Sequence, residues 1–422
     1  MYKFEKFVLD NGLRLIVSPT DHNEIALWLF IKGGSQHEKK EESGISHFIE
    51  HMLFRGTERW PTYKLIDEKT ERISQENGAH TDLEETSYFL RVQPRYFNEA
   101  LDLLSDWASA PLLRQVDIDK EKEIVPEEIR KDLDIPEKYV QWELWHEVCF
   151  GDQPAGWSIC GTEETIRTFS EGQIKKFFEK TYVGSRMLLV IAGDIKHKAV
   201  LEKVKKAFGG VKPGKLENPF SLKNQQKNPR SFVFYKDTQQ THFVLGFKTP
   251  FGPGTMESYA TDVLANILRH NIYITLIGDK GMLYSTVTDN PKDSTKSFIR
   301  SYAGVGHNKA EEAILSIMGE YKKMAQGNIE VKEADRAVRR IVRGMRTSFS
   351  MDPLDLVNFF GTQELFAGNI STPREVFKIY ESLKIKYLRE IAKTIFIPAN
   401  LNLAIIGPHT NQEKFQKLIE KF

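Results

Sequence analysis

The segment GISHFIEHMLFRGT, residues 44–57, places two histidines and a glutamate in an otherwise apolar pattern. On a helix, with about 100° per residue, His47, Glu50 and His51 lie on one side. The opposite side is apolar and consists of Ile45, Phe48, Ile49, Met52 and Leu53. Gly56 supplies a helix stop. Two helical histidines four residues apart can bind one zinc ion, with Glu50 beside them. The alternative is an ordinary amphipathic helix whose solvent-exposed face has two of the chain's 11 histidines.

A zinc ion held by two histidines needs a third protein ligand from another element. The acid-rich segment DIDKEKEIVPEEIRKDL, residues 117–133, predicts a helix that Pro126 kinks or deprives of one hydrogen bond. Glu121 and Glu128 are seven residues apart and therefore lie on one stripe of this helix. Two apolar residues share the stripe, Ile124 and Val125. If this stripe packs against the histidine helix, Glu128 binds the metal and Glu121 supports a ligand from behind. The alternative is an exposed acidic helix.

The bulk properties limit the possible classes of protein. A chain of 422 residues is long enough for two domains. Lys and Arg number 59 against 58 for Asp and Glu, so the net charge of +1 does not favour nucleic acid or an anionic membrane as partner. The two cysteines, Cys149 and Cys160, cannot form a disulfide framework. No apolar run is long enough to cross a bilayer. We expect a soluble, cytoplasmic protein.

The two halves of the chain repeat one pattern. FFEKTYVGSRMLLVIAGDI, residues 177–195, reads as a helix end, a turn and a buried strand that ends in Gly193. IAKTIFIPANLNLAIIGPH, residues 391–409, repeats this layout, with Gly407 at the matching place. The two glycines are separated by about half the length of the chain. One amphipathic helix follows each copy.

A second matched pair strengthens the repeat. TSYFLRV, residues 86–92, and SFIRSYAGV, residues 297–305, both read as strands, and each is followed by a helix. Strands and long helices alternate in clusters within each half. This predicts an α+β fold of two homologous domains, each a sheet with helices packed on one face.

The segment GGVKPGKLENPFSLKNQQKNPR, residues 209–230, is polar and rich in Pro, Gly and Asn, which is typical of a linker. We therefore expect a first domain at 1–212, a linker at 213–230 and a second domain at 231–422. Only the first domain has the metal pattern. In the second, an apolar helix around YATDVLANILRHN takes the corresponding place. The first domain has the candidate metal-binding residues, whereas the second is expected to share only the fold.

The first half resembles the M16 (pitrilysin-type, inverzincin) zinc peptidases, in particular the smaller members similar to mitochondrial processing peptidase. The resemblance is carried by DNGLRLIV, KGGSQHE, GISHFIEHMLFRGT, AHTDLEETSYFLRV, EKEIVPEEI and ICGTEETI, which occur in the family's order. The family pattern places its third ligand at a set spacing after its second histidine. Counting this spacing from His51 gives Glu128. The resemblance implies paired α+β domains that form a clamshell around an enclosed chamber.

The resemblance also implies roles for individual residues. His47, His51 and Glu128 are the expected ligands of one zinc ion per chain. Glu50 is the expected general base of peptide hydrolysis. Glu121, seven residues before the third ligand, is the family's second acid and is expected to orient a ligand without binding metal.

The strand AHTDLEETSYF corresponds to a family strand that lies at a sheet edge and receives the substrate as an added β-strand. Ala79 and Thr81 are the matching substrate-binding positions, so we expect cleavage of unstructured peptides or of a precursor peptide. The family usually has Asn before this alanine. Here the residue is Gly78, and Asn77 stands one place earlier.

The second half departs further from the family pattern. Active single-chain relatives carry an arginine and, seven residues later, a tyrosine, both of which hold the peptide. In LIGDKGMLYSTV the tyrosine is Tyr284, but Ile277 stands seven places before it. Tyr284 is the expected substrate-binding residue, although it could equally be a core aromatic.

The missing arginine predicts a heterodimer in which a homologous M16-like chain supplies an Arg/Tyr pair. The alternative is a homodimer in which Lys280 or another cation replaces the arginine. Two further classes stay open: a metal-free structural subunit, and a peptide-binding subunit that retains zinc but cleaves slowly. The first typically loses parts of the zinc motif, whereas this chain has all three ligands and the base.

Overall fold

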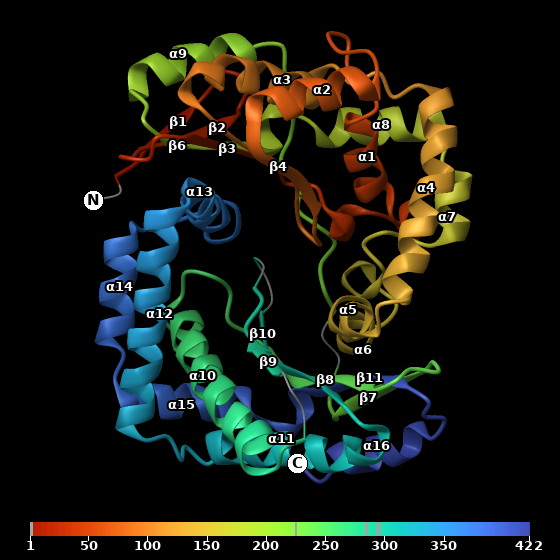
Figure 1. Ribbon diagram of the computed structural model, residues 1–422, viewed down its shortest axis with the longest axis vertical. Coiled ribbons are helices and arrows are strands. Elements are labelled where there is room, and N and C mark those ends of the chain that lie inside the picture. The colour runs from red at the N-terminus through yellow and green to blue at the C-terminus, as the bar shows by residue number, and fades with distance from the viewer. Residues whose placement is uncertain (1–2, 224–225, 283–285, 293, 295–296) are drawn as a thin grey trace. The chain divides into compact units, whose positions relative to one another are not determined.

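The computed structural model describes residues 3–223, 226–282, 286–292, 294 and 297–422. The chain forms two compact units (Figure 1). The first unit comprises Met1–Arg130, Trp157–Ser221 and Arg346–Pro373. The second comprises Lys131–Gly156, Leu222–Met345 and Arg374–Phe422. Each unit contains one mixed β-sheet with helices, which confirms the predicted α+β fold class.

The sheet of the first unit has the strand order β1-β2-β6-β3-β5-β4. Its strands are β1 Glu5–Val8, β2 Arg14–Pro19, β6 Met187–Gly193, β3 Ile25–Ile31, β5 Thr86–Val92 and β4 Ser74–Thr81. β2 and β6 run parallel, and the other neighbours are antiparallel. β4 lies at the edge, where the sequence predicts a peptide-binding strand.

The sheet of the second unit repeats this topology. Its strands, in order, are β7 Arg230–Tyr235, β11 Leu401–Gly407, β8 Thr241–Thr249, β10 Ser297–Val305 and β9 Thr286–Asp289. β7 and β11 are parallel and the other pairs antiparallel, as in β2-β6-β3-β5-β4. β6 matches β11, and β5 matches β10, so the predicted internal repeat is confirmed. β1 has no counterpart among the described strands of the second sheet.

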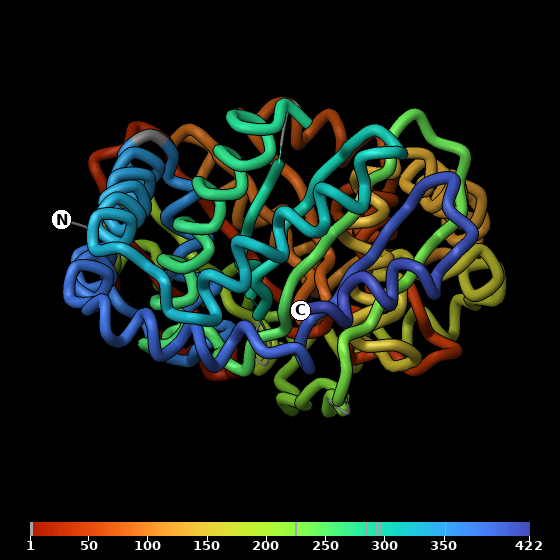
Figure 2. Tube along the Cα trace, turned by 90° about the horizontal axis from the view of Figure 1, so that it is seen from below, coloured from red at the N-terminus to blue at the C-terminus, as the bar shows by residue number. Residues whose placement is uncertain are grey.

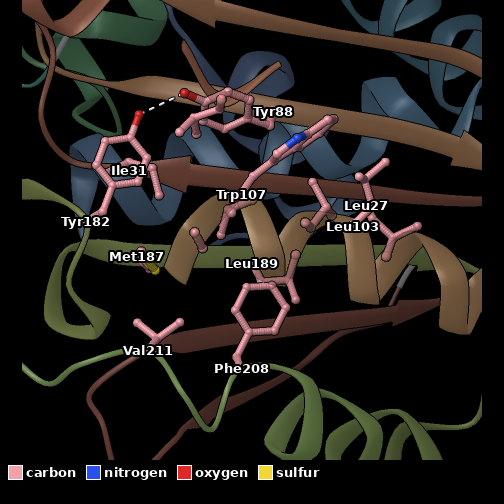
Figure 3. Packing of buried hydrophobic residues seen from close by; sticks show 14 of the residues in the cluster. Leu27, Ile31, Tyr88, Leu103, Trp107, Tyr182, Met187, Leu189, Phe208 and Val211 are labelled. Carbon is pink, nitrogen blue, oxygen red and sulfur yellow. Dashed lines mark hydrogen bonds between the residues drawn. The ribbon is translucent and has the colours of Figure 1, made fainter. Parts of the chain in front are cut away.

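Amphipathic helices cover one face of the first sheet and bury its apolar side chains. These helices include α3 Phe97–Ser109, α8 Glu171–Thr181 and α9 His197–Ala207. Figure 3 shows Trp107 of α3 packed among side chains from β3, β5 and β6. The hydroxyl groups of Tyr88 and Tyr182 are hydrogen-bonded at 2.7 Å within this core. This core fixes β5, Thr86–Val92, relative to the helices that pack on this face of the sheet.

The other face of the first sheet is covered by α13, Pro353–Thr362, which packs on β3 and β6 (Figure 1). A Cβ on Gly361 would lie 2.3 Å from the ring of Phe30, so helix and strand are in close contact. The prediction of helices on one face only was therefore wrong. β6 reads MLLVIAG without polar alternation, which is typical of a strand buried on both faces.

The second sheet is covered in the same way, by a segment from the first half of the chain. The π-helix η4, Val140–Leu144, and α6, Trp145–Phe150, form a common apolar cluster with β8, β10 and β11. Each unit thus contains a helical segment that comes from the sequence repeat of the other unit. The polar segment expected to be a linker, residues 213–230, contains no helix in its described parts, 213–223 and 226–230, and strand β7 begins at its last residue.

The remaining long helices of the second unit include α10 Met256–Tyr273, α11 Ala310–Ala325, α14 Pro373–Ser382, α15 Ile385–Ile395 and α16 Gln412–Ile419. Seen from below, α11, α15 and α16 lie together in front of the strands of this unit (Figure 2). None of the described helices combines the length and apolar character that crossing a bilayer requires.

Candidate metal centre

The histidine helix is α1, Ile45–Leu53, and its apolar face is buried as the sequence predicts. The five apolar residues are fully buried: Ile45, Phe48, Ile49, Met52 and Leu53. His47, Glu50 and His51 lie on the other side. The rings of His47 and His51 are 4.6 Å apart between centroids. Burial of one face therefore holds both imidazoles in neighbouring positions.

The start of α1 is fixed by two segments for which the sequence suggested no role. The buried carboxylate of Glu38 accepts hydrogen bonds from the backbone N–H groups of Gly44 and Ser46, each at 2.8 Å. Burial raises the pKa of Glu38 to about 8, against the effect of these hydrogen bonds. Gly44 has φ +92°, and a Cβ there would lie 2.6 Å from the carbonyl oxygen of Cys160. The segments KGGSQHE and ICGTEETI therefore position the metal helix.

The second metal-binding element is α4, Gln115–Leu133, which runs as one helix through Pro126. Glu121 and Glu128 lie two turns apart on the side that faces α1, because both contact His51. The buried apolar residues of α4 include Ile118 and Val125. Ile124 is 43% exposed, so its predicted place on this stripe was wrong. Ile124 lies beside the buried row of α4, and the apolar residue that belongs to this row is Ile118.

The three predicted ligands converge on one point. Nε2 of His51 lies 3.2 Å, and Nε2 of His47 lies 3.8 Å, from the same carboxylate oxygen of Glu128. One ligand atom from each of the three residues lies within 4.8 Å of the others. Zinc–ligand bonds of about 2.1 Å in a tetrahedron separate neighbouring ligand atoms by about 3.4 Å. The group fits a zinc ion, and within the described part of the chain it is the one such group of His, Cys, Asp or Glu residues.

Glu121 contacts His51 on the side of the ring opposite Glu128. Its carboxylate lies 3.1 Å from Nδ1 of His51 and also accepts a hydrogen bond from Arg55. Burial opposes ionisation of Glu121, but His51 and Arg55 together lower its pKa. A carboxylate on one ring nitrogen of a histidine leaves the other nitrogen directed at the metal. Arg55 was not recognised from the sequence, because its contact with Glu121 depends on how α1 and α4 pack.

The electrostatics of the group favour a cation. Burial alone lowers the pKa of His51, but its hydrogen bonds to Glu121 and Glu128 outweigh this effect and raise the pKa to about 10. Two carboxylates around one imidazole therefore stabilise positive charge strongly. A metal ion supplies that charge while the imidazole acts as a neutral ligand.

Glu50 lies beside this group and is held by the edge strand. The hydroxyl of Thr81, on β4, donates a hydrogen bond to one carboxylate oxygen of Glu50. Burial raises the pKa of Glu50, although this hydrogen bond opposes the shift. Thr81 is buried, and Ala79 packs against the core of the unit. The strand predicted to bind substrate is thus joined directly to the predicted base.

The departure at Gly78 has a steric reason. A Cβ on Gly78 would lie 2.7 Å from the ring of Phe89 on the neighbouring strand β5, so no larger residue fits without movement of that ring. Asn77 is exposed and its side chain donates a hydrogen bond to Ser74 at 3.1 Å.

A cavity opens beside Glu50 and His51, between α1, β4 and α2, Tyr63–Ile73. Apolar walls and polar groups both line it, among them Phe54, Ile66, Asp67, Asn77 and Ala79. The cavity is large enough and near enough to the candidate base to accept one side chain of a bound peptide.

Three residues of the second half bear on the prediction about peptide binding. Tyr284 lies outside the described residues. Ile277 lies on the π-helix η7, Ile274–Asp279. Lys280, the cation considered as a replacement for the missing arginine, forms an ion pair with Glu312 at 2.8 Å.

Comparisons with known proteins agree with this geometry. Residues 15–163 match the family described as insulinase (peptidase family M16), and residues 168–341 match the peptidase M16 inactive domain. The chain belongs to the M16 family of zinc proteases. The match to an inactive-domain description at 168–341 agrees with a metal pattern that is confined to the first half.

This M16 protease has relatives along its whole length. It is 27% identical to an uncharacterised zinc protease of Bacillus subtilis, over 96% of this chain and 99% of the relative. It is 25% identical to the mitochondrial-processing peptidase subunit beta of Saccharomyces cerevisiae, over 88% and 84% of the two chains. A crystal structure of a protease from Helicobacter pylori shares the fold, with a TM-score of 0.89 at 22% identity and coverage of 97% and 100%. Family and donor set together confirm the predicted zinc protease.

Proposed function

We propose that this M16 protease is a zinc-dependent endopeptidase that hydrolyses unstructured peptides. His47, His51 and Glu128 hold the zinc ion, Glu50 is the general base, and Glu121 is a positioning residue. The observation that carries the proposal is the contact of Thr81 with Glu50, which places a buried carboxylate beside the three ligands.

The residue types assign each step of peptide hydrolysis. Bound zinc lowers the pKa of water from about 15.7 to about 7 and polarises the scissile carbonyl. Glu50 accepts the proton of the attacking water and returns it to the departing amine. Thr81 occupies one oxygen of Glu50 and leaves the other for this transfer. Glu121 keeps Nε2 of His51 directed toward the metal.

The peptide binds to the edge of β4 as an additional strand. Main-chain hydrogen bonds to an edge strand require an extended peptide, which excludes a folded domain as substrate. Ala79 and Thr81 lie on this strand, and one side chain of the peptide enters the neighbouring cavity lined by Phe54 and Asp67. A stable folded domain cleaved as fast as a loose peptide contradicts this part of the proposal.

The active assembly is a heterodimer in which a homologous chain supplies an Arg/Tyr pair and completes an enclosed chamber. Two observations support it over a homodimer. Ile277 cannot form the paired hydrogen bonds of an arginine, and the charge of Lys280 is already paired with Glu312. A misplaced substrate can cost on the order of 100-fold in rate, so the lone chain should be slow.

The metal site is tested with three variants. Glu50→Gln should retain zinc and lose nearly all hydrolysis, because it removes only proton transfer. His51→Ala and Glu128→Gln should lose the metal. Zinc content by atomic absorption, together with hydrolysis of a fluorogenic peptide, separates these results. Equal zinc content in the wild type and Glu128→Gln contradicts the ligand assignment.

The heterodimer is tested by assaying the zinc-loaded chain with and without an M16-like chain that has the Arg/Tyr pair but lacks the zinc motif. We expect activity to rise on mixing, and Ile277→Arg to raise the activity of the lone chain. Full activity of the lone wild-type chain excludes the heterodimer while leaving the metal site intact.

A further inference from the structure

Helix α2 turns one stripe of residues toward the cavity beside the candidate base. Four of its residues line the cavity: Tyr63, Ile66, Asp67 and Thr70. Each lies three or four positions from two of the others, so all four share one face of the helix. Ile66 and Thr70 are buried, whereas Tyr63 and Asp67 are exposed. The α2 wall of the cavity therefore has a buried part and a solvent-accessible rim, and Asp67 belongs to the rim.

The edge strand β4 lines the same cavity through alternate residues. Asn77 and Ala79 are two positions apart, so their side chains lie on the same side of the strand. Thr81, two positions further on, donates a hydrogen bond to Glu50, which also lines the cavity. Because Glu50 must reach the water that attacks the scissile bond, a peptide side chain in this cavity belongs to one of the two residues that flank this bond.

The charged residues that line the cavity differ in their partners. The carboxylate of Glu121 accepts a hydrogen bond from Arg55, whose guanidinium group also lies 5.3 Å from the centroid of the Tyr63 ring. Glu50 is held by its hydrogen bond from β4. Asp67 forms no ion pair and no side-chain hydrogen bond with any residue that the structure describes. Its carboxylate is therefore an uncompensated negative charge at the rim.

We propose that this cavity accepts a lysine or arginine side chain of the peptide substrate, next to the scissile bond, and that Asp67 selects it. This rests on the proposed function and names the class of substrate. Lysine and arginine have an apolar stem and a cationic end. The stem lies along Phe54 and Ile66, and the cation reaches the carboxylate of Asp67. The cavity, of about 330 Å³, has room for a side chain of this size.

A basic side chain is favoured over the two alternatives. An acidic side chain approaches the carboxylates of Glu50 and Asp67, and Arg55, the arginine of the lining, is already bound to Glu121. An apolar side chain fills the walls but removes water from Asp67 without giving its carboxylate a partner, which costs free energy. Charge complementarity therefore separates the three classes of side chain.

The first test maps cleavage sites in a mixed peptide library by mass spectrometry. The zinc-loaded wild type should show Lys and Arg enriched about fivefold at one of the two positions that flank the scissile bond, as expected for an ion pair near the surface. Asp67→Asn should remove this enrichment, and Asp67→Glu, which keeps the charge, should preserve most of it. Glu68→Gln is the matched control, because Glu68 is exposed on α2, pairs with Lys64 at 3.6 Å and does not line the cavity. It should keep the enrichment.

The second test measures binding separately from catalysis. Zinc-loaded Glu50→Gln is titrated into two fluorescein-labelled peptides that have arginine or its neutral isostere citrulline at the preferred position, and anisotropy is recorded. We expect the arginine peptide to bind about fivefold more tightly, with a difference that shrinks as salt is added. Adding Asp67→Asn should reduce the difference to less than about twofold. Adding Glu68→Gln should leave it unchanged.

Three results overturn the proposal: a library profile without enrichment of Lys and Arg, an enrichment that survives Asp67→Asn, or an enrichment of Asp and Glu, which assigns the cavity to Arg55. If Asp67→Asn unfolds early in a thermal melt, Asp67→Ala takes its place, because alanine has the higher helix propensity. Absence of hydrolysis of every library peptide counts against the proposed function. Hydrolysis without a basic preference counts only against the role of Asp67.

Discussion

The two nitrogens of the His51 ring have different partners. Nε2 lies beside Glu128, and Nδ1 lies beside Glu121, so one helix approaches both sides of the ring. Glu121 is almost fully buried and held by Arg55, whereas Glu128 is 37% exposed. Burial and exposure thus separate the residue that fixes orientation from the residue that must reach the metal.

Glu121→Gln tests this division. The amide lacks the charge that makes His51 a strong ligand, so zinc should bind about 10–100-fold more weakly while still binding at the same residues. Competition with a fluorescent chelator measures the affinity. Glu123→Gln changes an exposed acid of the same helix and should have no effect. An unchanged affinity in Glu121→Gln rules out a supporting role for Glu121.

A second residue, His37, makes stability depend on pH. Burial, together with the charges of Arg186 and Lys32, lowers the pKa of His37 from 6.5 to about 4. Between pH 6.5 and 4 the unfolded chain takes up the proton and the folded chain does not. Stability should therefore fall as the pH drops through this range, by at most about 3 kcal/mol, and level off below pH 4. Urea unfolding midpoints at pH 7 and pH 4.5 should differ less in His37→Gln than in the wild type. A parallel loss in both proteins excludes His37 as the cause.

At the scale of elements, periodicity predicted what depends on neighbours in sequence. The buried face of α1 and the repeat of β6 in β11 follow from local spacing, whereas Glu128 was assigned as the third ligand through the family resemblance. Long-range contacts were not predictable in this way. The capping of α1 by Glu38 and the packing of α13 on the first sheet join segments whose meeting no local pattern encodes. Ile124 was misplaced because two adjacent apolar residues leave the buried row ambiguous.

The contribution of α13 can be measured through Phe360, which is fully buried and has its ring centroid 5.2 Å from that of Phe4. Phe360→Ala leaves a cavity beneath the sheet and should reduce the free energy of unfolding by about 3–5 kcal/mol. Denaturant unfolding followed by circular dichroism gives the value. Asn358→Ala, at an exposed position of the same helix, should change it by no more than about 0.5 kcal/mol. Similar values for the two variants contradict the packing role of α13.

At the scale of the whole molecule, sequence repeats and compact units are not the same pieces. Residues 131–156 lie in the first half of the chain but belong to the second unit, and residues 346–373 show the reverse relation. The two sheets share a topology, so the repeat is a property of the strands. The helices that close their second faces are exchanged, so neither half contains all the parts of one unit.

Dividing the chain therefore has a defined outcome. A fragment of residues 1–212 lacks α13 and leaves residues 131–156 without their sheet. We expect it to lack a cooperative thermal transition and to bind zinc poorly when expressed alone. Co-expression with residues 213–422 should restore both properties in a non-covalent complex. An isolated 1–212 fragment that melts cooperatively at the temperature of the full chain contradicts this expectation.

The exchange also orders events during synthesis on the ribosome. The strands and the metal-binding helices of the first unit are complete at residue 221, but the last segment of this unit ends only at residue 373. At roughly 5–20 residues per second, the delay between these two points lasts roughly 8–30 s. Throughout that time Phe30 and its apolar neighbours on the uncovered face of the sheet have no helix to pack against. The nascent chain therefore exposes an apolar surface, to which chaperones can bind, until most of the second unit has been translated.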